Sequence, residues 1–363
     1  MEKVTVYYIL YVLFLLVAYI GSKRNSTGEK TLQEENMICF LLVAGLLMLR
    51  HQSMGIDLNW RGGNGYLWVF DQAVKNDFGS FFEAVSKNHY EWFFKLYTKI
   101  VSLISIRRQF FIAFTAFLSL TPIAVFFSRR SSKPVLSWII YMGMSPFLVL
   151  FSNLRQGLDI GLAVLLYMLA EEKKPVRFLL VLTLAVLVHT SAILLLMIYP
   201  AVNLRIGFRA RIAGVVILVA GSLFRSQIAA VIEKLFPMYA KYLDVEGTVS
   251  YRLFVVFILI YLVCCFYTDG SEFQNAYMNL FFLACGCQLT GLFSEVIPRE
   301  GFYFMPALCV LLPSIIDGMK SKKLSLVLEM GTCMCFAVFG LYSIYTTYWS
   351  MSYPYYWFWQ KIS

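Results

Sequence analysis

The sequence predicts an all-α membrane protein of about twelve transmembrane helices, and three observations lead to that class. The chain of 363 residues is 60% hydrophobic, and only 14% of its residues are charged. Soluble domains contain roughly 45–50% apolar and 25% charged residues, so a soluble fold is excluded. The apolar residues also fall in long runs between short basic segments, as in proteins that cross a bilayer repeatedly.

Apolar runs mark the expected spans in chain order. They cover about 4–20, 37–49, 109–127, 135–150, 157–170, 176–188, 190–203, 210–224, 251–267, 276–292, 302–317 and 324–346. A full crossing takes about 20 residues, although 17 can suffice. Several runs are shorter, which indicates tilted or partial helices around a cavity. The first run is expected to be a retained span, because Met1-Glu2-Lys3 does not supply the basic start of a signal peptide.

The apolar stretch 176–202 decides the topology. As one helix it would be about 40 Å long, well beyond a hydrocarbon core of roughly 30 Å. A turn at His189-Thr190-Ser191 would divide it into two short helices. With that turn, fifteen lysines and arginines gather in the loops of one side. Such clusters mark the cytoplasmic side, so both termini are predicted to lie outside.

The external side then holds two long segments, at about 50–108 and 225–250. The first contains amphipathic stretches, Tyr66–Val74 and Tyr90–Ile104, which predict helices lying in the interface or re-entering the membrane. No repeat or linker divides the chain, so residues 1–363 are predicted to form a single integral membrane domain. The eight cysteines lie in apolar runs without a zinc or disulfide spacing, and we expect no metal and no cofactor. The net charge of +10 indicates topology rather than a nucleic-acid partner.

Polar residues at the external span ends are the candidate functional residues. Arg155 and Gln156 stand between two apolar spans without an evident acidic partner, and an arginine so close to hydrocarbon indicates function. Its guanidinium presents five donors in a planar fork that suits phosphate oxygens, and the amide adds another donor. The alternative is a snorkelling arginine that anchors the topology.

Other candidates lie on the same predicted side. Arg50 ends the second span, and Asp57 follows in a glycine-containing loop, where it can act as a base or bind sugar hydroxyls. A salt bridge between Arg50 and Asp57 is the alternative. His189 can pass protons near neutral pH or can simply cap the turn.

The remaining candidates are aromatic, acidic or cationic. Arg299 can clamp a phosphate or a sugar, with Tyr303 near it, or belong to an ordinary polar turn. The first long loop offers rings and a carboxylate for carbohydrate stacking or for an interfacial belt. These side chains are Trp60, Tyr66, Trp68, Glu91 and Trp92.

These motifs and their order resemble the EpsG family, the Wzy-type polymerases of bacterial exopolysaccharide and O-antigen. The matching elements are Arg50-x4-Gly55-x-Asp57, then Tyr66 and Phe70, Leu154-Arg155-Gln156, His189 with Ser191, and Arg299 leading to Phe304. They extend over about residues 40–310. The interval from Asp57 to Tyr66 is longer than in the family pattern, through an insertion around Arg61–Gly65.

The resemblance implies a fold related to the GT-C glycosyltransferases and a multi-pass position in the bacterial inner membrane. It implies polymerisation of oligosaccharide repeats on undecaprenyl diphosphate at the external, periplasmic face, beside a flippase and a chain-length regulator. Arg155 and Arg299 would then be diphosphate ligands, and Arg50 a third ligand or the partner of Asp57. Asp57 would be the first choice for the base, ahead of His189 and Glu91.

Three alternatives belong to other classes. A glycan ligase usually carries its large external loop late in the chain, whereas the long loop here comes early. A transporter or flippase predicts repeat symmetry and charges at mid-span, whereas the charges here gather at one face. An acyltransferase using His189 would need a carboxylate in a neighbouring helix, and the sequence suggests none.

Overall fold

The computed structural model describes residues 2–23, 29–59, 65–235, 243, 251–294, 297–347 and 350–362. Within these residues the chain forms α- and 3-10 helices, and the bridge between Arg50 and Trp357 is the one strand-like contact. The predicted all-α class is confirmed.

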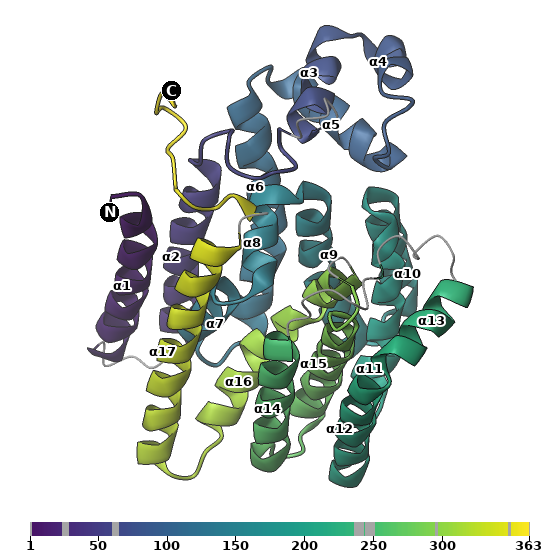
Figure 1. The fold of residues 1–363 in the computed structure, drawn as a ribbon. Helices are drawn as coiled ribbons and strands as arrows, with labels where there is room; N and C mark the ends of the chain where they lie inside the picture. Colours follow the sequence, from purple (N-terminus) through teal and green to yellow (C-terminus); the bar gives the residue numbers. More distant parts are fainter. Residues whose placement is uncertain are drawn as a thin grey trace.

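Helices that lie side by side form the body of the molecule (Figure 1). The longer ones are α1 (Glu2–Lys23), α2 (Glu29–Met48), α6 (Arg108–Arg130), α9 (Leu154–Glu171), α10 (Pro175–Val188), α12 (Phe208–Leu223), α14 (Tyr251–Tyr267), α15 (Glu272–Thr290) and α17 (Lys322–Thr346). Shorter elements complete the body: α7 (Pro134–Met142), α8 (Ser145–Ser152), η1 (Thr190–Met197), α11 (Ile198–Asn203), α13 (Arg225–Leu235), η3 (Ile297–Tyr303), η4 (Met305–Ala307) and α16 (Leu308–Asp317).

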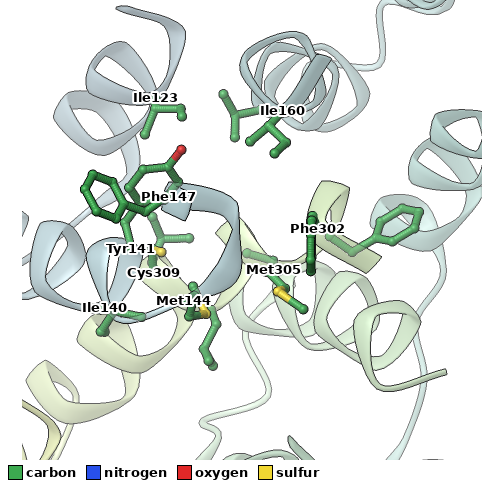
Figure 2. Packing of buried hydrophobic residues seen from close by; sticks show 14 of the residues in the cluster. Ile123, Ile140, Tyr141, Met144, Phe147, Ile160, Phe302, Met305 and Cys309 are labelled. Atoms are coloured by element: carbon green, nitrogen blue, oxygen red, sulfur yellow. The ribbon is translucent and has the colours of Figure 1, made fainter. Parts of the chain in front are cut away.

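The interior of this body is a continuous apolar core. Figure 2 shows part of it, where Ile123, Tyr141, Phe147 and Met305 from four different elements face one another. Large apolar side chains also cover the outside, and Leu180 is 67% exposed. Such an outer surface is unfavourable in water and suits a hydrocarbon surrounding, which agrees with a membrane protein.

A second layer covers one end of the body. It consists of α3 (Tyr66–Lys75), α4 (Phe78–Ala84) and α5 (Trp92–Ile104), which lie above the helix ends in Figure 1. These helices bury one face against the start of α6 and of α9 in an apolar cluster of their own. The amphipathic pattern therefore predicted helices correctly, since the apolar stripe of α3 and α5 is what this cluster buries.

The predicted turn at His189 is confirmed. α10 ends at Val188, and η1 begins at Thr190. Asn203, at the end of α11, donates a hydrogen bond to the carbonyl of Ala170 at 3.2 Å, close to where α10 begins. The chain therefore reverses at His189 and returns to the same end of the body.

One predicted span is bent rather than straight, and a second bend lies at the end of the predicted span 210–224. α7 and α8 meet at 63° around Gly143, where the expected span 135–150 would be continuous. Pro146 lies in the first turn of α8, and its missing N–H cannot continue the hydrogen bonds of α7. α12 and α13 meet at 85°.

Fewer helices than predicted meet a strict length and composition criterion for crossing a membrane. Among the described residues there are four, α2, α6, η3–α16 and α17, or up to six if each bent pair counts as one span. α10, η1–α11 and α14 are apolar but shorter. The number twelve remains a prediction that also counts these shorter helices.

The predicted basic clusters meet at the end opposite to α3–α5. Arg130, at the end of α6, pairs with Glu171 at the end of α9 at 2.7 Å, and Lys133 pairs with Glu329 near the start of α17 at 2.8 Å. Basic residues of these predicted clusters thus lie at this end of the body, where two of them pair with carboxylates.

Candidate active site

Arg50 is wholly buried at the end of α2. It donates to the carbonyl of Leu150 in the last turn of α8, and its guanidinium lies 5.1 Å from the ring centre of Phe151. Its Nε and Nη2 atoms have no hydrogen-bond partner. Arg50 and Asp57 form no ion pair, so the salt bridge considered from the sequence is wrong. The carbonyls that end α8 attract the guanidinium instead.

Gly55 and Asp57 continue this contact along α8. A Cβ atom at Gly55 would lie 1.9 Å from the carbonyl oxygen of Phe151, and the φ of Gly55 is +105°. Ser152 donates its hydroxyl to Asp57 Oδ2 at 3.0 Å. The Arg-x4-Gly-x-Asp motif therefore holds its loop against three consecutive residues of α8. We call residues 50–57 the strip on α8.

Gly55→Ala is expected to destabilise the fold by roughly 2 kcal/mol or more, because it adds both backbone strain and a direct clash with α8. Thermal unfolding of the purified protein measures this loss. Gly45→Ala is the matched control, since a Cβ there meets nothing within 4 Å and lies inside α2. Equal melting temperatures for the two variants would contradict the role given to the strip.

Arg155 lies in the first turn of α9, after the N-cap residue Asn153. Its guanidinium forms an ion pair with Glu91, donates from Nε to the hydroxyl of Tyr66 at 3.3 Å, and lies 4.4 Å from the ring centre of Tyr90. The expectation that Arg155 has no acidic partner is wrong. Glu91 lies 64 residues earlier and reaches Arg155 because the layer of α3, α4 and α5 covers the start of α9.

Glu91 connects Arg155 to the His189 turn. One carboxylate oxygen accepts from Arg155, and the other accepts from the Thr190 amide at 3.0 Å and lies 3.2 Å from His189 Nδ1. Burial alone would raise the pKa of Glu91, but the hydrogen bond from His189 and the charge of Arg155 outweigh it and hold that pKa well below its usual value.

The Glu91 carboxylate indicates which nitrogen of the His189 ring carries a proton. A carboxylate can only accept hydrogen bonds, so Nδ1 of His189 carries a proton in this contact. In the neutral ring, Nε2 is then an acceptor, which is the form that a general base requires. The sequence suggests no carboxylate for His189, because Glu91 comes from the layer of α3, α4 and α5 rather than from a neighbouring span.

The start of α9 also contacts η3. Gln156 donates its amide to the carbonyl of Arg299 at 2.8 Å. Tyr303, buried at the end of η3, has its hydroxyl 2.9 Å from the hydroxyl of Ser191. The structure thus brings together predicted residues from α5, α9, η1 and η3.

The predicted stacking residues of the long loop divide into two groups. Tyr66 is 1% exposed and stacks on Tyr90 with ring centres 4.8 Å apart, so these rings hold Arg155 rather than present a free face. Trp92 is 60% exposed and can reach an interface. Trp60 and most of the insertion around Arg61–Gly65 lie outside the described residues.

Two carboxyl groups near Arg155 were not among the predicted site residues. Asp159 lies one turn after Arg155 on α9 and is fully buried, and neither of its oxygens has a hydrogen-bond partner. Glu300, in η3, has a buried Oε2 atom without a partner. The spacing of Asp159 from Arg155 places both on one face of a helix, and that signal could have identified it.

Fold and site together define an all-helical membrane protein that gathers buried ionisable side chains at one end of its helices. Within that class the chain belongs to the EpsG family, whose sequence model matches residues 36–357. This is a family of polysaccharide polymerases, which supports a glycosyltransferase-like activity in general terms. No curated protein and no solved structure gave a match.

Proposed function

We propose that this protein joins undecaprenyl-diphosphate-linked oligosaccharide repeats into O-antigen, capsule or exopolysaccharide at the external face of the inner membrane. The observation that carries the proposal is the chain of contacts Arg155–Glu91–His189, which sets a buried cation beside a histidine whose Nδ1 meets a carboxylate. We also propose that the protein has twelve membrane spans and a fold related to the GT-C enzymes. A flippase and a chain-length regulator are the proposed partners.

In the proposed reaction a hydroxyl of the incoming repeat attacks the anomeric carbon of the growing chain. The new carbon–oxygen bond forms as the bond from that carbon to the lipid diphosphate breaks. The hydroxyl proton passes to His189 Nε2, and the diphosphate leaves with its negative charge facing Arg155. Because this charge grows as the bond breaks, a fixed guanidinium stabilises the transition state more than the ground state.

The start of α9 contributes to the same anion site. Its first-turn amides point toward the end that carries Arg155, and a helix N-terminus attracts a negative charge. Gln156 and Arg299 are proposed to hold the second phosphate or the first sugar. Arg50 is proposed to position the loop of Asp57 rather than to touch substrate, since it is wholly buried on α8.

His189 replaces Asp57 as the first choice for the base. His189 shares Glu91 with Arg155, so the imidazole lies close to the proposed leaving group. Asp57 receives a hydrogen bond from Ser152 and belongs to the strip on α8. Glu91 is a poor base, because its depressed pKa keeps it ionised and weakly basic.

Reconstitution tests the function directly. The full chain in liposomes, supplied with an undecaprenyl-diphosphate-linked repeat unit alone, is expected to produce a ladder of longer lipid-linked glycans and free undecaprenyl diphosphate. Mass spectrometry measures both products. Transfer only after addition of a different acceptor lipid would indicate a ligase instead. Movement of the unit between leaflets without any change in mass would indicate a transporter, and either result would overturn the proposal.

A further inference from the structure

A polar cavity of about 510 Å³ lies at the end of the body opposite to the candidate active site. Its walls come from the end of α6, the α9–α10 turn, the end of α11 and the start of α15. It is lined by four basic and two acidic side chains, namely Arg129, Arg130, Lys173, Arg205, Glu171 and Glu272.

The two carboxylates do not neutralise this cavity. Each is already taken by one of the basic side chains, in the pairs Glu171–Arg130 and Glu272–Arg205. Arg129 and Lys173 form no ion pair with any residue that the structure describes. Both are exposed at the cavity, so an anion that enters it can approach two cations outside the ion pairs.

The backbone of Lys173 has an unusual conformation. Its φ is 53°, in the left-handed region, and its amide closes the end of α9 on the carbonyl of Ala170 at 3.1 Å. Glycine is the usual residue at such a helix end, because a Cβ atom there crowds the next carbonyl. This conformation holds the Lys173 backbone at the wall of the cavity.

Two further hollows continue from the cavity along α12. The first, of about 490 Å³, shares Arg205 and Glu272 with the cavity and also contains Asp269 and Arg211. The second, of about 230 Å³, shares Arg211 with the first and lies between α11, α12, α14 and α15. Most of its lining is apolar, including Leu204, Ala210 and Phe282. A polar cavity and an apolar groove thus adjoin the same hollow.

Arg211, at the junction of these hollows, is a buried cation among neutral partners. It is 5% exposed, and it donates to the Tyr261 hydroxyl at 3.2 Å and to Asn275 Oδ1 at 2.6 Å. α12 begins beside it at Gly207, which has no side chain to cap the helix and faces open space. A helix N-terminus next to an arginine attracts an anion.

We propose that these adjoining hollows bind an anionic phospholipid from the leaflet at that end, with its phosphate between Arg129 and Lys173 and an acyl chain in the groove beside α12. Basic pockets between transmembrane helices are suited to anionic headgroups. A free phosphate ion would use the same cations, but it would leave the apolar groove empty. The inference is independent of the polymerase reaction, since it concerns the other end of the molecule.

Native mass spectrometry of the full chain in detergent tests this site, with titrations of phosphatidylglycerol, phosphatidylcholine and inorganic phosphate. Wild type is expected to retain phosphatidylglycerol and to discriminate against phosphatidylcholine. The double variant Arg129→Gln/Lys173→Gln should bind phosphatidylglycerol about thirtyfold more weakly. Lys322→Gln/Lys323→Gln is the matched control, because it removes two exposed charges at the same end but outside the cavity.

A third variant separates the groove from the charges. Ala210→Phe should fill the groove and weaken phosphatidylglycerol binding while leaving any inorganic phosphate binding unchanged. Equal losses of phosphatidylglycerol affinity in the two double variants would show a general attraction of the lipid to basic residues at this end, and would overturn the proposed site. Equal affinity for phosphatidylcholine would overturn the anion preference. Inorganic phosphate bound as tightly as phosphatidylglycerol would overturn the lipid assignment.

Discussion

Arg155→Ala is expected to lower polymer formation about 100- to 1,000-fold. This is the usual effect of removing one hydrogen-bond donor that stabilises the negative charge developing in a transition state. Single repeat units on the lipid carrier should still be made and should accumulate, because their synthesis precedes this step. The loss is expected because Arg155 is a buried guanidinium at the start of α9, held in place by Glu91 and Tyr66. Polymer length in cells and the turnover rate in liposomes measure the loss of activity.

Two controls separate chemistry from folding in that experiment. Arg155→Lys keeps the charge opposite Glu91 but loses the planar fork, so it should retain the fold and only part of the activity. Arg107→Ala removes an exposed arginine at the same end and should leave polymerisation unchanged. Polymer of normal length from Arg155→Ala, at wild-type protein levels, would defeat the assignment of a diphosphate site.

His189→Gln is expected to reduce the rate about 100-fold or more, since it removes the proposed proton acceptor. Glutamine keeps a polar side chain that can still meet Glu91, so the turn between α10 and η1 should remain folded. Asp57→Asn should cost less than about tenfold, because Ser152 can still hydrogen-bond the amide that replaces the carboxylate. Single-turnover rates in liposomes compare the two variants.

A second histidine provides the control for this comparison. His51 lies at the same end of the body, where its Nδ1 is 2.9 Å from the Ser53 hydroxyl. His51→Gln should leave the rate near that of wild type. If Asp57→Asn lost more activity than His189→Gln, the order of the bases would return to the one that the sequence suggested.

Local chemistry explains why much of the fold could be predicted. Long apolar runs predict helices in a membrane regardless of their neighbours, since every backbone polar group must bond within its own segment. The turn at His189 was predictable because one helix over that stretch would be too long for the hydrocarbon core. The bend between α7 and α8 was missed, although Pro146 gives a local reason for it.

The candidate site was only partly predictable, because its key contacts join distant segments. Arg155 stood out by its hydrophobic surroundings, but nothing near it indicated Glu91 as its partner. For the same reason, the sequence did not indicate that Glu91 orients His189. Asp159 was missed for a different reason: its spacing from Arg155 was visible, but its complete burial was not.

By itself, the sequence determined that this chain is a helical membrane protein, which residues at the span ends are polar, and where the longest apolar stretch turns back. These follow from the transfer of side chains and backbone between water and hydrocarbon, which each segment undergoes on its own. Only the tertiary structure decided that Arg50 is buried on α8 and that Glu91 joins Arg155 to His189. Such pairings depend on how α5, α8, α9 and η1 pack together, and short-range sequence patterns carry no record of that packing.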